Sequence, residues 1–140
     1  MDDQMMESGG CLEEKMMKDN QYQIKANLLY RWIRFGQNGI TVSKLLLNRG
    51  YHSIAIYGYN EIARCFMYEA EKGEFTIRYL IDRKGDTLPV SFSVLSVDEF
   101  NGDDVDALLV MLVDSEDVCD ELRMRFKCDV ISVEELFYEL

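Results

Sequence analysis

Short apolar segments that have no polar face alternate with helix-like segments from residue 53 onward, and this alternation constrains the fold most strongly. The segment 106–113, DALLVMLV, is the clearest example. A strand that is apolar on both faces has to be covered on both faces, which is typical of parallel strands joined by helical crossovers. Right-handed crossovers then predict an α/β fold, a small doubly wound, Rossmann-like parallel sheet of order 3-2-1-4-5 with residues 54–57 at its centre.

The elements of this main domain, residues 51–140, follow from hydrophobic periodicity. We expect strands at 53–57, 75–81, 88–94, 106–113 and 129–131, and helices at 60–72, 115–126 and 133–140. Two further segments pair a serine with a glutamate three residues later: Ser96 with Glu99, and Ser132 with Glu135. This is the spacing of a capping box, so both segments are interpreted as junctions between a strand and a helix.

Residues 1–50 carry a different pattern. Residues 1–20 are Met-rich, charged and interrupted by two adjacent glycines, so we expect a flexible lead-in with at most a helical turn at 11–18. Residues 21–50 are expected to be helical and packed on the main domain, with a second short helix at 41–48. A helical stripe carries Ile24, Leu28, Trp32 and Phe35, with Leu29 and Ile33 beside it. Trp32 is interpreted as the anchor of this segment, and the alternative is a stacking platform for a base.

Charge and composition exclude several classes of function. The 140 residues suit one domain, and a net charge of −11 without a segregated basic stripe argues against a nucleic-acid partner. No apolar run reaches the roughly 20 residues of a membrane span, and no secretory signal is recognisable, so we expect a cytoplasmic protein. The four cysteines include no C-x-x-C pair and the only histidine is His52, so no metal site is predicted.

The segment SIAIYGYNEIARCF, residues 53–66, has the outline of a dinucleotide-binding turn between a strand and a helix. In the pattern G-x-G-x-x-G or G-x-G-x-x-A, the first glycine allows a tight turn, the second lets the backbone approach a diphosphate, and the third packs the helix on the strand. The three positions are Gly58, Asn60 and Ala63 here. Asn60 departs from the pattern, because its side chain fills space that a diphosphate would use, or caps the helix.

The residues around this turn contain further groups that fit a nucleotide. The first helical turn, with Glu61 and Ile62, presents peptide nitrogens and a helix dipole to an anion. Asp82 ends the next strand 24 residues after Gly58, where a carboxylate binds the ribose hydroxyls in the dinucleotide fingerprint. A turn-starting aspartate is the alternative for Asp82. The neighbouring Arg83 is able to accept a 2′-phosphate, or is an exposed turn residue.

These motifs together resemble those of a known group of proteins. The segments IAIYGYNEIARCF, IRYLIDRKGD, LPV and VDALLVMLV look like the small Rossmann-type domain of bacterial polysaccharide-biosynthesis proteins, which occurs in nucleotide-sugar dehydratases and beside glycosyltransferases. The resemblance covers about residues 50–140. It implies that Gly58, Tyr59, Asn60, Glu61 and Ile62 face the diphosphate of NAD(H) or of a UDP-sugar and that Asp82 faces the ribose. It also implies a glycosyltransferase as a partner.

A complete catalytic set is not recognisable. Tyr68 and Lys72 form a Y-x-x-x-K string, but they lie on the first helix after the glycine turn, where we interpret the match as a coincidence. Asp114 and Ser115 follow the most apolar strand, at the edge where open α/β sheets bind ligands. They are expected to line a site, and the simpler alternative makes Ser115 a helix cap.

Two hypotheses of function remain. In the first, the chain is a nucleotide or nucleotide-sugar binding module, an accessory to cell-surface polysaccharide synthesis. In the second, it is a degenerate Rossmann-like scaffold for protein association, with residues 21–48 docking a partner or a second copy in a homodimer. Asn60 separates them: an open cradle of peptide nitrogens favours the first, and an asparagine side chain that fills this space favours the second.

Overall fold

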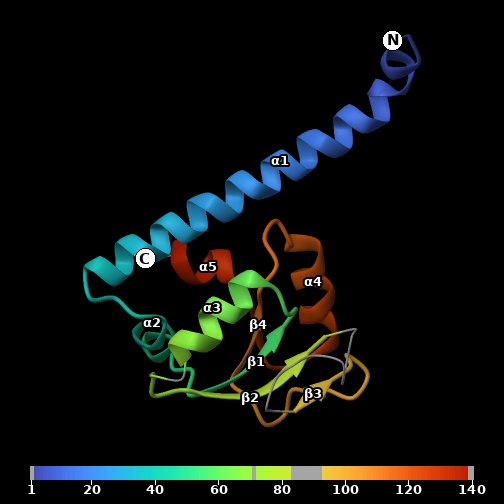
Figure 1. The fold of residues 1–140 in the computed structure, drawn as a ribbon. Helices are drawn as coiled ribbons and strands as arrows, with labels where there is room; N and C mark the ends of the chain where they lie inside the picture. Colours follow the sequence, from blue (N-terminus) through green and yellow to red (C-terminus); the bar gives the residue numbers. More distant parts are fainter. Residues whose placement is uncertain (1, 71, 83–92, 139–140) are drawn as a thin grey trace.

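Five parallel strands form a single sheet in the order β3-β2-β1-β4-β5 (Figure 1). The structure is a computed structural model that describes residues 2–70, 72–82 and 93–138, with side chains from residue 14 onward. The strands are β1 (Ser53–Tyr57), β2 (Thr76–Ile81), β3 (Val94–Leu95), β4 (Ala107–Val110) and β5 (Asp129–Ser132). This confirms the predicted α/β class and strand order. Of the strand expected at 88–94, residues 88–92 lie outside the described residues.

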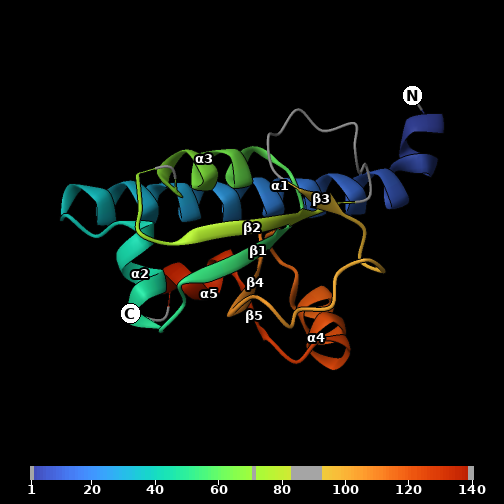
Figure 2. The same cartoon turned by 90° about the horizontal axis from the view of Figure 1, so that it is seen from below.

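The sheet divides the apolar core into two layers. Ile54 and Ile56 of β1 belong to one cluster and Ala55 between them to the other, as the alternation of side chains along a strand requires. Helix α3 (Glu61–Ala70) packs in the first cluster and α4 (Glu116–Arg125) in the second. Figure 2 shows these two helices on opposite sides of the sheet. Both faces are therefore covered, as expected for strands that have no polar face.

Three more helices belong to the layer that contains α3: α1 (Asp2–Gln37), α2 (Val42–Asn48) and α5 (Val133–Tyr138). Helix α2 starts after Thr41, whose hydroxyl caps it, close to the predicted position. Helix α1 differs from the prediction, because residues 2–20 are part of one long helix rather than a flexible lead-in. More than half of these residues are good helix formers such as Met, Glu and Lys, which outweigh the two adjacent glycines.

Trp32 fixes α1 on the rest of the domain, as predicted for an anchor. Its ring is 9% exposed and its centroid lies 4.9 Å from that of Phe137 and 6.3 Å from that of Phe66. The indole nitrogen donates a hydrogen bond to the carboxylate of Glu69 on α3. The same carboxylate accepts a hydrogen bond of 3.1 Å from the peptide nitrogen of Val42 at the start of α2. One side chain of α3 thus holds both N-terminal helices.

The two serine–glutamate pairs each form one of the two bonds of a capping box. Ser132 accepts a 3.1 Å hydrogen bond from the peptide nitrogen of Glu135, at the junction of β5 and α5. In the other pair the Glu99 carboxylate accepts a 3.0 Å bond from the nitrogen of Ser96. Residues 97–99 form a turn and no helix, so only the pair Ser132 and Glu135 marks the predicted junction of a strand and a helix.

Substitution Trp32→Ala should lower the free energy of unfolding by about 3–5 kcal/mol, because it removes a buried aromatic and leaves the Glu69 carboxylate without its indole donor. Chemical denaturation measures the loss. The matched control is Tyr30→Ala on the same helix, whose side chain is 67% exposed. Equal losses for the two variants would show that Trp32 does not anchor α1.

Asp106 joins the starts of β1 and β4. Its carboxylate accepts hydrogen bonds from the peptide nitrogens of His52, at 2.7 Å, and Ser53, at 3.0 Å. These two bonds lower the pKa of the Asp106 carboxyl from its ordinary value, because they stabilise its charged form. The Asp106 side chain therefore provides the hydrogen-bond acceptor for two peptide N–H groups at the start of the central strand.

We expect Asp106→Asn to be less stable than the wild type at neutral pH and to approach it in acid. A lowered pKa means that the carboxylate contributes stability above its unfolded pKa of about 3.9, and that this contribution is lost as the pH falls through the folded pKa. Unfolding curves between neutral pH and acid would measure it. Asp103→Asn serves as the control, and a pH-independent gap between wild type and Asp106→Asn would contradict the expectation.

Candidate functional site

The carboxyl ends of the strands meet at one edge of the sheet. Tyr57 at the end of β1 pairs with Ile81 of β2 on one side and with Val110 of β4 on the other. The residues that follow, Gly58 and Asp82, therefore lie side by side at this edge. The strand order reverses between β1 and β4, and this switch point is where open α/β sheets place a ligand.

Gly58 makes the turn that the sequence predicts. Its φ of +92° is a conformation that side-chain-bearing residues rarely adopt. Its nitrogen donates a 2.9 Å hydrogen bond to the carbonyl of Ile81, so the turn continues the pairing of β1 with β2. A Cβ atom at this position would lie 3.3 Å from Cδ2 of Leu112. The glycine is thus needed for the chain direction, and the space above it is occupied by a leucine side chain from the loop after β4.

Asp82 closes the turn from the β2 side. Its Oδ2 accepts a 2.9 Å hydrogen bond from the peptide nitrogen of Tyr59, the first nitrogen past the glycine. The sequence analysis left Asp82 open between a ribose ligand and a turn aspartate, and in the structure its carboxylate bonds to the turn. The negative charge lies where a diphosphate would approach the backbone.

Asn60 fills the switch point. Its side-chain Nδ2 donates a 2.9 Å hydrogen bond to the carbonyl of Met111, which follows β4, and its Oδ1 accepts a 2.8 Å bond from the nitrogen of Ala63 in α3. One side chain therefore caps the helix and spans the crevice between β1 and β4. The side chain thus bridges the two strand ends, and Asn60 also lines the cleft beside α1 that is described below.

The remaining predicted site residues are placed as follows. Glu61 is exposed in the first turn of α3, and the side chain of Ile62 is 2% exposed and packs in the core. Arg83 lies outside the described residues. The structure thus brings Gly58, Tyr59, Asn60 and Asp82 together, and it does so through bonds that these residues make within the chain.

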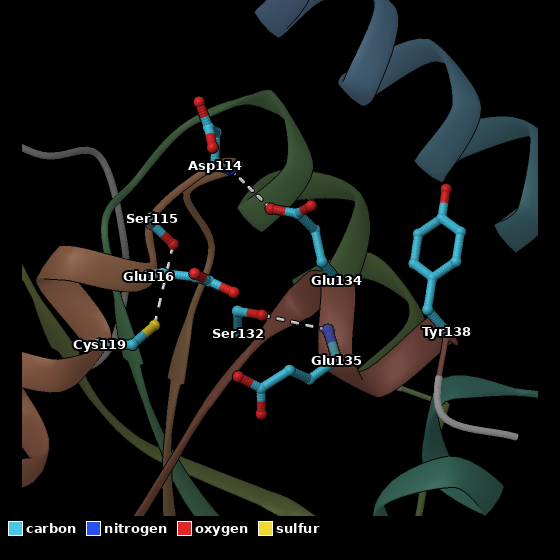
Figure 3. Close-up of a pocket in the computed structure, with 8 residues that line it drawn as sticks. All are labelled: Asp114, Ser115, Glu116, Cys119, Ser132, Glu134, Glu135 and Tyr138. Atoms are coloured by element: carbon cyan, nitrogen blue, oxygen red, sulfur yellow. Dashed lines mark hydrogen bonds between the residues drawn. The ribbon is translucent and has the colours of Figure 1, made fainter.

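A second hollow of about 310 Å³ lies beyond the ends of β4 and β5 (Figure 3). Asp114 and Ser115 line it, as expected for residues at this edge. Ser115 occupies the position before α4, but its hydroxyl donates to the carbonyl of Leu112 at 2.8 Å, so the predicted side-chain cap is absent at this described position. Burial raises the pKa of the neighbouring Cys119 thiol, which disfavours its thiolate form.

Two of the four carboxylates that line this hollow, those of Glu134 and Glu135, bond to other groups of the chain. Glu134 accepts a 2.6 Å hydrogen bond from the peptide nitrogen of Asp114, and Figure 3 shows the two residues facing each other. Glu135 accepts a 2.9 Å bond from Arg123. The described residues contain no group of three or more His, Cys, Asp or Glu side chains that could hold a metal ion. Glu134 and Glu135 therefore have structural roles at this edge.

A larger cleft, of about 720 Å³, lies between α1 and the start of α3. Tyr22, Lys25 and Leu29 line it from α1. Four of the predicted site residues line it from the glycine turn and the start of α3: Tyr59, Asn60, Glu61 and Ile62. The sequence analysis missed only the wall that α1 contributes, because this wall depends on where α1 crosses the domain. One signal was present: Tyr22, Ala26, Leu29 and Ile33 form a second apolar stripe on α1, at helical spacing.

Tyr68 and Lys72 lie near the end of α3, away from the edge that carries the glycine turn. The Lys72 amine donates a 3.3 Å bond to the Tyr68 hydroxyl, and the Tyr68 side chain is 63% exposed. The pair is an exposed helix-surface contact, which agrees with the interpretation of Y-x-x-x-K as a coincidence.

Comparison with known proteins leaves function to be inferred from the chain itself: no family model, curated protein or solved structure matches it. The resemblance to polysaccharide-biosynthesis domains stays a prediction, as does the cytoplasmic location. Within the described part of the chain, none of the helices combines the length and apolar character that a membrane crossing requires.

Replacing Asn60 by alanine should cost about 1–2 kcal/mol, because α3 loses its cap and the Met111 carbonyl loses its donor. The matched variant Asn60→Asp keeps an acceptor for Ala63 but has no donor for Met111, so we expect an intermediate loss. Chemical denaturation, with amide exchange at Ala63 as a local readout, checks both. Wild-type stability in Asn60→Ala would mean that this side chain does not hold the crevice together.

Proposed function

We propose that this chain is a protein-association module, a doubly wound sheet that no longer uses its switch point for a nucleotide. One observation carries the proposal: the peptide nitrogens of Tyr59 and Ala63 at the glycine turn already donate to the chain's own oxygens, at 2.9 and 2.8 Å. In a nucleotide-binding turn, nitrogens of this kind serve the phosphates. Here both nitrogens donate to side-chain oxygens of the chain itself.

The energetics weigh against a diphosphate at this position. It would have to displace the Asp82 carboxylate from Tyr59, and a hydrogen bond to a charged group is worth about 1.5–3 kcal/mol. It would also have to displace Asn60, leaving the Met111 carbonyl without its donor. The carboxylates of Asp82 and Glu61 would repel a phosphate in addition. The nucleotide hypothesis therefore requires this turn to rearrange on binding.

The outer surface of α1 supports association with a protein. Met16, Met17, Tyr22 and Ile33 are each at least 60% exposed along this one helix. Isolated apolar side chains are normal on a surface, but several along one helix indicate an interaction surface. Because α1 also packs on the domain through Leu28 and Trp32, it presents apolar side chains in two directions.

A thermal-shift and calorimetry panel with NAD(H), NADP(H) and UDP-sugars tests the proposal. A ligand that binds only the native state raises stability by about 2.7 kcal/mol at 100 times its Kd, so a binder gives a clear shift. We expect none for the wild type at millimolar ligand. The variant Asn60→Gly places a glycine at the second position of the pattern, and Asn60→Asp serves as its control. A ligand-induced shift in Asn60→Gly alone would show that the asparagine side chain prevents nucleotide binding. A saturable shift in the wild type would overturn the proposal.

A further inference from the structure

We infer that α1 pairs with α1 of a second copy of this chain in antiparallel orientation, each N-terminal half lying along the α1–α3 cleft of the other copy. The inference rests on the proposed function, because it names the partner of the association module. Three features carry it: the overhang of α1, its second apolar stripe, and the distribution of charge along it.

Helix α1 extends far beyond the part of the domain that it covers. Its packing side chains run from Ile24 to Phe35, and residues 14–23 are all exposed. Figures 1 and 2 show the N-terminal half projecting away from the sheet and its helices. At 1.5 Å per residue, residues 2–23 form a projection about 33 Å long. A helical segment without packing is marginally stable in water, so this projection calls for a partner.

The second stripe has the spacing of a helix–helix seam. Tyr22, Ala26, Leu29 and Ile33 are separated by four, three and four residues, the alternation that brings apolar side chains to one face of a paired helix. At 100° per residue, this stripe points away from the direction of Leu28. Tyr22 and Ile33 are 67% and 60% exposed. Tyr22 and Leu29 also line the cleft, so the stripe continues into it, and the lining of the cleft also includes polar and charged side chains.

The charges of α1 identify the occupant as a second copy and fix its orientation. In the sequence, residues 2–19 carry six carboxylates and two lysines, whereas residues 20–37 carry three cations and no carboxylate. Arg31 donates to the carbonyl of Phe137 on α5, so Lys25 and Arg34 are the cations of this half that remain for a partner. Antiparallel pairing sets each acidic half against the partner's basic half, and parallel pairing sets like charges together. Lys25 and Arg64 line the cleft that the partner's acidic half would follow.

Two-fold pairing of this kind is closed and uses the same surface on both copies. A strip as long as α1, about 54 Å, and about 10 Å wide covers roughly 500 Å². Adding the α3 side of the cleft brings each copy toward the about 800 Å² that a stable interface buries per partner. A dimer formed only by α1 and its cleft is therefore large enough to persist.

Sedimentation equilibrium of the full chain tests the dimer. We expect twice the 16.3 kDa chain mass for the wild type, and the single-chain mass for Leu29→Asp/Ile33→Asp. Met124→Asp, which places the same charge at a side chain 90% exposed on α4, should remain a dimer. Circular dichroism reports folding, and Ile33→Asp alone serves if the double variant unfolds. A wild-type monomer, or a dimer unaffected by Ile33→Asp, would overturn the inference.

A charge exchange tests the orientation. Lys25→Glu/Arg34→Glu makes both halves of α1 acidic, and Glu14→Lys/Asp19→Lys weakens the acidic half, so each variant should dimerise at least tenfold more weakly than the wild type. Mixed together, they should form a heterodimer that is tighter than either homodimer. The wild-type dimer should weaken as salt rises. A dimer that tightens with salt, or variants that do not prefer each other, would exclude antiparallel pairing.

The outcomes separate this inference from the proposed function. A wild-type monomer that also binds no nucleotide would remove the second copy as partner and leave the association module intact. A wild-type dimer that Ile33→Asp dissociates and that also binds a nucleotide would support the pairing of α1 and overturn the claim that the switch point is not used for a nucleotide.

Discussion

The side chain of Asn60 is the constraint on which the interpretation of this domain depends, because it joins two loops that a nucleotide would hold apart. Its amide donates to the carbonyl of Met111 after β4, and its oxygen caps α3 at Ala63. Each bond satisfies a backbone group at the switch point that would otherwise need water or a ligand. The turn at Gly58 and the carboxylate of Asp82 complete the same closed network. The peptide nitrogens of Tyr59 and Ala63 and the carbonyl of Met111 are therefore all paired within the chain.

The sheet could be predicted from the sequence because its signals are local. Residues 53–57 are apolar without helical period, and a glycine and a helix follow at once, so the strand and its crossover are specified within about a dozen residues. Strand order then follows from the handedness of crossovers and from burial on both faces. The glycine turn was predicted for the same reason, since only Gly58 among its neighbours tolerates a φ of +92°.

The bonds at the sheet edge could not be predicted, because they join residues far apart in the chain. Asp82 meets Tyr59 only after β2 has paired with β1, and Asn60 meets Met111 only after β4 has done so. Ser115 has the sequence position of a cap, yet its hydroxyl bonds backward to Leu112. Helix α1 was misjudged for another reason: its two glycines suggested a break, and the summed propensity of its Met, Glu and Lys residues decided the outcome.

The crevice at Asn60 and the exposed face of α1 differ in the kind of partner that they are able to bind. In a nucleotide-binding member of this architecture, the unsatisfied groups are polar and lie at the switch point. In this domain those polar groups bond to one another, and exposed apolar side chains remain on α1, including Tyr22 and Ile33. Unpaired peptide nitrogens select an anion, whereas an exposed apolar helix stripe selects another helix. Under the proposed function, the surface that binds a partner lies on the N-terminal helix rather than at the sheet edge.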